Sequence, residues 1–176
     1  MHFYFIRHGQ TDANHQRILQ GGSIDLPLNA TGKSQAQELI PKVKRLNFLD
    51  IYVSPLKRAF ETAAICLPEY ENRFQLEPSI KEWSLGEWEG QPGEQFMDLF
   101  LGNGEPQLGE SRRTFYSRVE GFLQTAISKQ APYMMVAHGG VWMVVQDYLG
   151  LERFRIKNGE LIELKQNSAG WVQRVI

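Results

Sequence analysis

The chain has 176 residues, 42% of them apolar, with a formal net charge of −1 and one cysteine. This length suits one domain with a sizeable core, spanning residues 1–176. The balanced charge predicts no binding to nucleic acid or to a membrane surface, and the single Cys66 excludes an intrachain disulfide or a CxxC metal motif. Because strand residues begin at once, without a basic leader, we expect no signal peptide and a cytoplasmic location.

The first part of the chain alternates between short apolar strands and amphipathic helices. Residues 2–7 predict a buried strand, and residues 31–46 predict a helix with Thr31 as its N-cap. Pro41 lies inside that helical pattern and should kink or interrupt it. Residues 50–54 then predict a second strand.

The middle of the chain continues the alternation around one irregular segment. Residues 55–67 predict a helix that begins at a proline. Residues 86–110 are rich in glycine and acidic residues and predict a small lid or cap over one edge of the sheet. Residues 111–129 form an amphipathic pattern with Ser111 as N-cap, and residues 133–137 predict a third buried strand.

The last part of the chain completes the fold class. Residues 140–150 predict a short, largely buried helix, and residues 159–176 alternate on both sides of an Asn-Ser-Ala-Gly turn, as in a hairpin. Strands that alternate with helices favour an α/β fold with a mostly parallel sheet, to which the hairpin adds antiparallel character.

Polar residues follow three of the predicted strands. Arg7 and His8 come directly after the first strand, Arg58 lies one helical turn beyond the second, and His138 follows the third. Because ligands bind beyond the carboxyl ends of parallel strands, these four side chains should meet at one edge of the sheet. Each could also be an ordinary polar residue, but four at matching positions favour a site. Planar guanidinium groups suit phosphate, so the pattern predicts a phosphate site.

The same residues belong to a set of motifs. Residues 7–14 resemble the RHGxTxxN signature of the histidine phosphatase superfamily, also called phosphoglycerate-mutase-like. Residues 54–62 resemble its SPxxRAxxT motif, residues 80–90 its LxExxxGxWEG element, and residues 136–140 its final His-Gly motif. The matches run in family order. The resemblance implies a three-layer α/β/α sandwich.

The resemblance also implies a set of site residues. The expected catalytic set consists of Arg7, His8, Arg58, Glu82 and His138. Further phosphate or substrate contacts are expected from Asn14, Gln20, Gly21 and Gly139. No metal or cofactor is expected, because the arginines would repel a divalent cation.

The chemistry of these residue types suits phosphoryl transfer. The neutral imidazole of His8 is a good nucleophile toward phosphorus, while Arg7 and Arg58 neutralise the phosphoryl oxygens. His138, expected to be cationic, would supply another donor, and Gly9 would leave room at the phosphate.

The leaving oxygen needs a proton, which one enclosed carboxyl group can supply. The family spacing selects Glu82, beside an apolar wall at Trp83. Glu87 is expected to be solvated, and Glu89 to help fix a turn.

The length and charge of the cap favour hydrolysis of a small phosphomonoester. Mutases of this superfamily carry a long insertion, whereas only residues 83–137 separate the two last motifs here. Residues 83–110 contain no Lys or Arg, and Arg112 and Arg113 are expected to face solvent. After the His-Gly motif, where many family phosphatases have an Ile-Arg pair, this chain has Val141-Trp142-Met143, so that arginine is missing. The alternatives are a phosphoglycerate mutase-type transfer, a metallohydrolase and a non-catalytic phospholigand-binding module.

Overall fold

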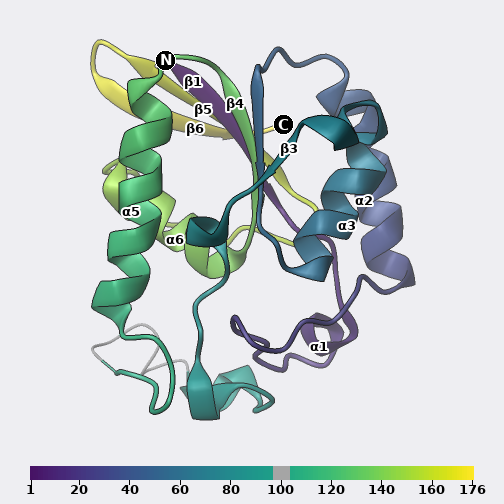
Figure 1. Ribbon diagram of the computed structural model, residues 1–176, viewed down its shortest axis with the longest axis vertical. Coiled ribbons are helices and arrows are strands. Elements are labelled where there is room, and N and C mark those ends of the chain that lie inside the picture. The colour runs from purple at the N-terminus through teal and green to yellow at the C-terminus, as the bar shows by residue number, and fades with distance from the viewer. Residues whose placement is uncertain (97–103) are drawn as a thin grey trace.

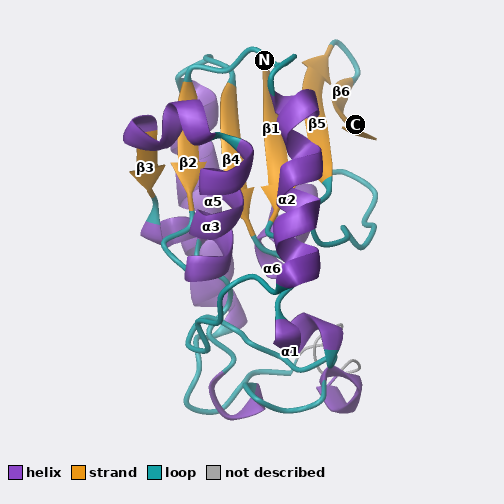
Figure 2. Ribbon diagram, turned by 90° about the vertical axis from the view of Figure 1, so that its right-hand side faces the viewer, coloured by secondary structure: helices purple, strands orange, loops and turns teal. Residues whose placement is uncertain are grey.

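The centre of the molecule is a six-stranded sheet. The computed structural model describes residues 1–96 and 104–176. The strands are β1 (His2–Arg7), β2 (Asp50–Val53), β3 (Phe74–Leu76), β4 (Tyr133–Ala137), β5 (Leu161–Asn167) and β6 (Gly170–Val175). They lie in the order β3-β2-β4-β1-β5-β6 (Figure 2). The pairs β1–β4, β2–β4 and β2–β3 are parallel, whereas β5 pairs antiparallel with β1 and β6. The predicted mostly parallel sheet with an antiparallel C-terminal part is confirmed. β3 was not predicted, because a three-residue strand leaves little hydrophobic pattern.

Helices cover both faces of this sheet. α2 (Ala30–Val43) and α3 (Lys57–Cys66) lie on one face, and α5 (Arg112–Ser128) and α6 (Gly139–Tyr148) lie on the other (Figure 1). Alternate residues of β1 enter separate buried clusters: Phe3 and Phe5 pack on the side of α5 and α6, and Tyr4 and Ile6 on the side of α2 and α3. This two-residue period is that of a strand buried on both faces. The α/β/α sandwich is therefore confirmed.

Local hydrogen bonds correct the predicted start of α2. The N-cap is Asn29, whose Oδ1 accepts the backbone N–H of Gly32 at 2.9 Å, so the prediction of Thr31 as cap is wrong. The helix is not interrupted at Pro41 and ends at Val43.

The other helix starts are close to the predictions. Ser111 caps α5 as predicted, with its Oγ accepting the N–H of Thr114 at 3.1 Å. α3 begins at Lys57, two residues after Pro55, and the short 3₁₀ turns Pro68–Arg73 and Pro78–Ile80 flank β3.

The described part of the predicted cap lies beyond the carboxyl ends of the central strands (Figures 1 and 2). It contains the 3₁₀ turns Gly86–Trp88 and Gly93–Phe96, and residues 97–103 lie outside the described residues. It is joined to the chain that follows α1 (Asp12–His15). There, the N–H of Leu19 donates to the carbonyl of Gln91 at 3.0 Å, and Leu19 accepts from Gly90 at 2.8 Å. Two segments far apart in sequence thus surround the edge where the polar strand ends lie.

None of the helices in the described ranges is long and apolar enough to cross a membrane.

Candidate active site

The sheet brings the three polar strand ends together. The N–H of His8 donates to the carbonyl of Ala137 at 3.0 Å, and the N–H of Ser54 donates to that of Val136 at 3.0 Å. The residues that follow β1, β2 and β4 therefore lie side by side. The ring centroids of His8 and His138 are 5.2 Å apart. Both rings and the Arg58 side chain are almost completely buried, with at most 3% exposed.

His8 is held in one tautomer. Its Nδ1 lies 2.7 Å from the carbonyl oxygen of Gly9. Because a carbonyl only accepts, Nδ1 carries the proton and Nε2 keeps its lone pair. Burial, with the charges of Arg58 and Arg7, holds the pKa of His8 well below its usual range. The imidazole is therefore neutral at neutral pH and offers Nε2 as a nucleophile.

His138 is also neutral in the free protein. Burial lowers its pKa well below the usual range, and the charges of Arg58 and of the other site residues add to this effect. The expectation of a cationic His138 is therefore wrong. Its Nε2 lies 2.7 Å from the hydroxyl of Ser54, and no group in residues 1–96 and 104–176 pairs with its Nδ1. Ser54 therefore orients this ring, a role that was not predicted although the SPxxRAxxT motif contains Ser54.

Backbone carbonyls fix the two arginines. Arg7 donates through Nη1 to the carbonyl of Ile156 at 2.6 Å. Arg58 donates to the carbonyl of Ile24 at 3.0 Å and to that of Gly21 at 2.8 Å. Burial lowers the pKa of Arg7 to about 10 and also lowers the pKa of Arg58, while the charge of Glu82 opposes both shifts. Arg7 is thus a cation at neutral pH whose orientation is set before any anion binds.

The segment around Gly21 supports Arg58. Gly21 has a φ of +54°, and a Cβ there would lie 2.2 Å from Oε1 of Glu89. Glu89 accepts the N–H of Gly22 at 3.1 Å and of Leu85 at 2.9 Å, so it fastens this segment to the cap rather than fixing only its own turn. Gln20 is buried, and its Oε1 has no partner in the described part of the chain. Gly21 was expected to contact phosphate or substrate, and the hydrogen bond that the structure shows for it is the one from Arg58 to its carbonyl.

Glu82 is the carboxylate that reaches this cluster. Its Oε1 accepts the N–H of Trp83 at 3.0 Å, and its Oε2 accepts the N–H of Gly140 at 3.0 Å. Arg118 donates to the Glu82 carbonyl at 3.1 Å and pairs with Glu110 at 2.7 Å, which fixes the backbone. Trp83 is buried and stacks on a phenylalanine of α5, as the predicted apolar wall requires. By contrast, the Glu87 side chain is exposed.

Asn14 and two glycines complete the placement of the predicted residues. Oδ1 of Asn14 accepts the N–H of Thr11 at 3.2 Å within α1. A Cβ at Gly139 would make ordinary contact with Arg7, at 3.6 Å from Nε. A Cβ at Gly9 would lie 2.4 Å from the carbonyl oxygen of Gly32. A glycine is thus required at position 9 because α2 approaches closely there. The predicted reason was room for the phosphate, but the close contact that the structure shows is with α2.

A family comparison agrees with this geometry. The family model of the histidine phosphatase superfamily (branch 1) matches residues 3–176. The chain belongs to the histidine phosphatase superfamily.

Individual relatives of this superfamily member carry phosphatase names. An uncharacterised phosphatase, PhoE, of Bacillus subtilis (strain 168) is 38% identical over 76% of this chain and 69% of that protein. Fructose-2,6-bisphosphatase TIGAR B of Danio rerio is 32% identical over 76% of this chain and 54% of that protein. The crystal structure of a putative alpha-ribazole-5'-P phosphatase from Escherichia coli superposes with a TM-score of 0.84 at 27% identity, covering 100% of this chain and 95% of that chain. The chain spans between 41% and 54% of the first curated relatives.

Some acidic residues in the described part of the cap of this histidine phosphatase superfamily member are engaged by the protein itself. Glu94 pairs with Arg17 at 2.9 Å, and Glu105 accepts the N–H of Arg112 at 2.7 Å. Glu89 and Glu110 are also engaged, as described above. The pairs of Glu94 and Glu110 with arginines offset part of the negative charge of the cap.

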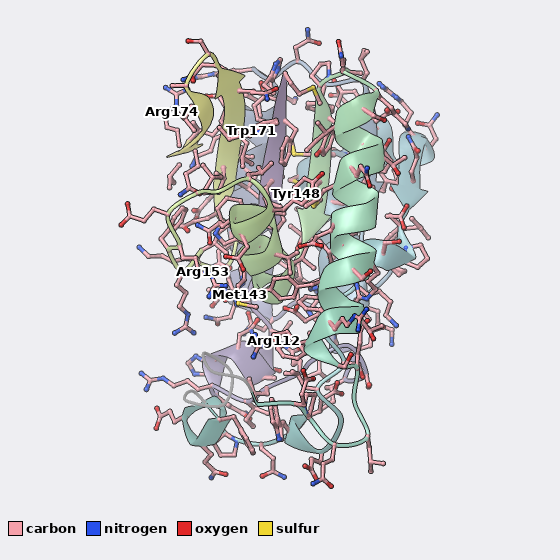
Figure 3. All side chains as sticks on the ribbon, turned by 90° about the vertical axis from the view of Figure 1, so that its left-hand side faces the viewer. Arg112, Met143, Tyr148, Arg153, Trp171 and Arg174 are labelled. Atoms are coloured by element: carbon pink, nitrogen blue, oxygen red, sulfur yellow. The ribbon has the colours of Figure 1, made fainter. Side chains whose placement is uncertain are left out.

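Arg112 lies between the N-terminal end of α5 and the loops beneath the sheet (Figure 3). It is half-buried, and its guanidinium carbon lies 4.9 Å from the centre of the Trp83 ring. The prediction that Arg112 faces solvent is therefore wrong, whereas Arg113 is exposed as predicted. Met143 is half-buried on α6.

A Gly140→Ala variant should displace Glu82. A Cβ at Gly140 would lie 2.3 Å from Oε1 of Glu82, and its nearest neighbours are the movable end of that side chain and the side chain of Phe115. The chain should fold, while kcat/KM for alkyl phosphates should fall on the order of 10²-fold, the usual effect of misplacing a reacting group.

Gly121→Ala is the matched control. Nothing lies within 4 Å of a Cβ at Gly121, in the middle of α5. This variant should keep its activity and gain about 0.5–1 kcal/mol of stability from the better helix former. Equal steady-state kinetics for both variants would contradict the tight packing at Gly140.

The two buried imidazoles predict a pH-dependent stability. Burial depresses the pKa of both His8 and His138 below 6.5, so the unfolded chain binds more protons than the folded protein below that pH. The contribution of these histidines to the free energy of unfolding should be constant above pH 6.5. Below pH 6.5 it should decrease by up to about 1.4 kcal/mol per pH unit for each histidine. Urea unfolding of the wild type and of His8→Gln and His138→Gln variants measures this. If the free energy of unfolding of both variants depends on pH below 6.5 as steeply as that of the wild type, the prediction is contradicted.

Proposed function

We propose that the protein is a phosphomonoesterase that hydrolyses a small phosphorylated metabolite through a phosphohistidine intermediate. One observation carries this proposal above the others. The 2.7 Å hydrogen bond to the Gly9 carbonyl leaves the Nε2 lone pair of a neutral His8 free, beside Arg7, Arg58 and His138. A site that only bound phosphate would need the cations but not this fixed nucleophile.

In the first step, Nε2 of His8 attacks phosphorus in line while the bond to the ester oxygen breaks. Glu82 gives its proton to that leaving oxygen, so an alcohol departs. The imidazole becomes positively charged when its lone pair forms the new bond. The Gly9 carbonyl stabilises this charge through the proton on Nδ1. Arg7 and Arg58 stabilise the charge on the phosphoryl oxygens, and they need no reorganisation because carbonyls already hold them.

In the second step, water attacks the phosphohistidine. It gives a proton to the Glu82 carboxylate, the nitrogen–phosphorus bond breaks, and the electron pair returns to Nε2. Phosphate leaves, which restores both residues. His138 can donate from Nδ1 to a phosphoryl oxygen if Ser54 holds the other ring nitrogen as an acceptor.

Two alternatives are less well supported. In residues 1–96 and 104–176, no group of three or more His, Cys, Asp and Glu side chains could hold a metal ion, so these residues give no support to a metallohydrolase. Residues 83–137 leave room for only a small cap, which favours water access over the enclosed transfer of a mutase. The relatives' names include hydrolases of a sugar bisphosphate and of alpha-ribazole phosphate, which supports a small ester as substrate.

A phosphate-release assay over a panel of metabolite monoesters tests this proposal. We expect turnover of at least one ester, with activity unchanged after treatment with a chelator, because Arg7 and Arg58 take the electrophilic role of a metal. Vanadate should inhibit. Activity that returns only with an added divalent metal contradicts the metal-independent mechanism. Mutase turnover of 3-phosphoglycerate that exceeds every hydrolysis rate contradicts the assignment as an esterase.

A further inference from the structure

Asn158, in the loop that precedes β5, contacts the backbone of the candidate site. Its side chain is half-buried, and its Nδ2 donates to three oxygens. These are the carbonyl of His8 at 3.1 Å, the carbonyl of Gly9 at 3.4 Å and Oδ1 of Asn14 at 3.1 Å. None of the motifs includes Asn158.

Backbone contacts fix the place of this residue. The N–H of the next residue, Gly159, lies 3.1 Å from the carbonyl of Arg7 and 3.2 Å from that of His8. The carbonyl of Ile156, two residues before Asn158, accepts a hydrogen bond from the Arg7 guanidinium at 2.6 Å. Residues 156–159 are therefore attached to residues 7–9 at several points. The backbone of Asn158 is thus held in a fixed position relative to the site.

The direction of both amides follows from one backbone donor. The N–H of Thr11 can only donate, so the Asn14 atom that faces it at 3.2 Å must be Oδ1. Asn158 faces the same oxygen, and it also faces two carbonyls, so it must present Nδ2. Both acceptor positions of Asn14 Oδ1 are then used within the protein. In residues 1–96 and 104–176 no hydrogen bond engages its Nδ2 hydrogens, which remain for another acceptor.

The geometry points to Asn158 as a positioning residue that turns the Asn14 amide so that its N–H groups face the bound phosphate. This inference rests on the proposed function and on the expectation, from the family motif, that Asn14 contacts the phosphate. Without Asn158, Asn14 keeps only its bond to Thr11, and its amide can rotate and present an oxygen to the anion.

A double-mutant cycle tests this coupling. Asn158→Ala should weaken the binding of inorganic phosphate and of vanadate, and lower kcat/KM, by about tenfold, a usual size for residues coupled through a hydrogen bond. Asn14→Ala should cause a loss at least as large. In the Asn14→Ala background, Asn158→Ala should cost less than about twofold more. Asn158→Ser, too short to reach the Asn14 amide, repeats the test if the alanine variant folds poorly.

Asn167→Ala is the control, because in the described part of the chain the contact of Asn167 Oδ1 is with the N–H of Ala169, in the hairpin turn. It should leave phosphate affinity unchanged. An equal loss on replacing Asn158 in both backgrounds, or no loss at all, overturns the positioning role even if the wild type hydrolyses esters. Coupled phosphate affinities in a wild type that hydrolyses no ester would instead support Asn158 and reject the esterase. A wild type that binds neither phosphate nor vanadate overturns both.

Discussion

Replacing His8 by alanine should abolish phosphate release, with kcat lower by a factor on the order of 10⁶, as when other enzymes lose their nucleophile. The loss should be this large because the nucleophile has no substitute. His138 is the nearest imidazole, 5.2 Å away between ring centroids, but its Nε2 is engaged with Ser54. Steady-state release of phosphate from the preferred ester measures the change.

His15→Ala is the matched control, because His15 is exposed at the end of α1. It should keep wild-type turnover. Circular dichroism should show that both variants fold. Turnover by His8→Ala at more than a small fraction of the wild-type rate would contradict nucleophilic catalysis by His8.

Replacing Glu82 by glutamine should slow the cleavage of alkyl phosphates by about 10²–10⁴-fold, the usual contribution of a general acid. An alkoxide is a poor leaving group and needs the proton that Gln cannot supply. A nitrophenolate needs none, so activated aryl phosphates should lose much less. The amide oxygen of the glutamine can still accept one of the two backbone N–H groups, that of Trp83 or that of Gly140, which bond different oxygens of the carboxylate.

Glu87→Gln controls for the loss of a carboxylate from the same segment, since its side chain is exposed. It should leave both classes of ester unaffected. Equal losses for alkyl and aryl esters in Glu82→Gln would contradict proton donation, and a larger loss at Glu87 would transfer the role to that residue.

Much of the fold could be predicted because its signals are local. The apolar runs of β1, β2 and β4 are short and bounded by polar residues, and α5 shows its buried face and its Ser111 cap. Parallel strands place their carboxyl ends at one edge, so the approach of His8 to His138 follows from topology alone. β3 and the cap at Asn29 escaped because their signals are weak or ambiguous in a single sequence.

The electrostatics of the site could not be predicted in the same way. The neutral state of His138 depends on complete burial beside Arg58, and burial is a property of the folded chain. Arg112 lies over Trp83 because α5 begins there, which reverses the solvent exposure expected for a first helical residue. Asn158 contacts His8 across 150 positions of sequence, without any local pattern.

The most direct test of the account is to trap the phosphoryl group. Wild-type protein mixed rapidly with an excess of its preferred ester and quenched in alkali should carry one phosphoryl group per chain, stable to alkali and labile to acid. Fragmentation mass spectrometry of the alkali-quenched peptides should place it on His8, and ³¹P–¹⁵N coupling should place it on Nε2, the nitrogen not bonded to Gly9. A phosphoryl group on His138 or on any other residue would contradict the account. So would turnover without a trapped phosphoryl group under conditions in which breakdown of the phosphohistidine limits the rate.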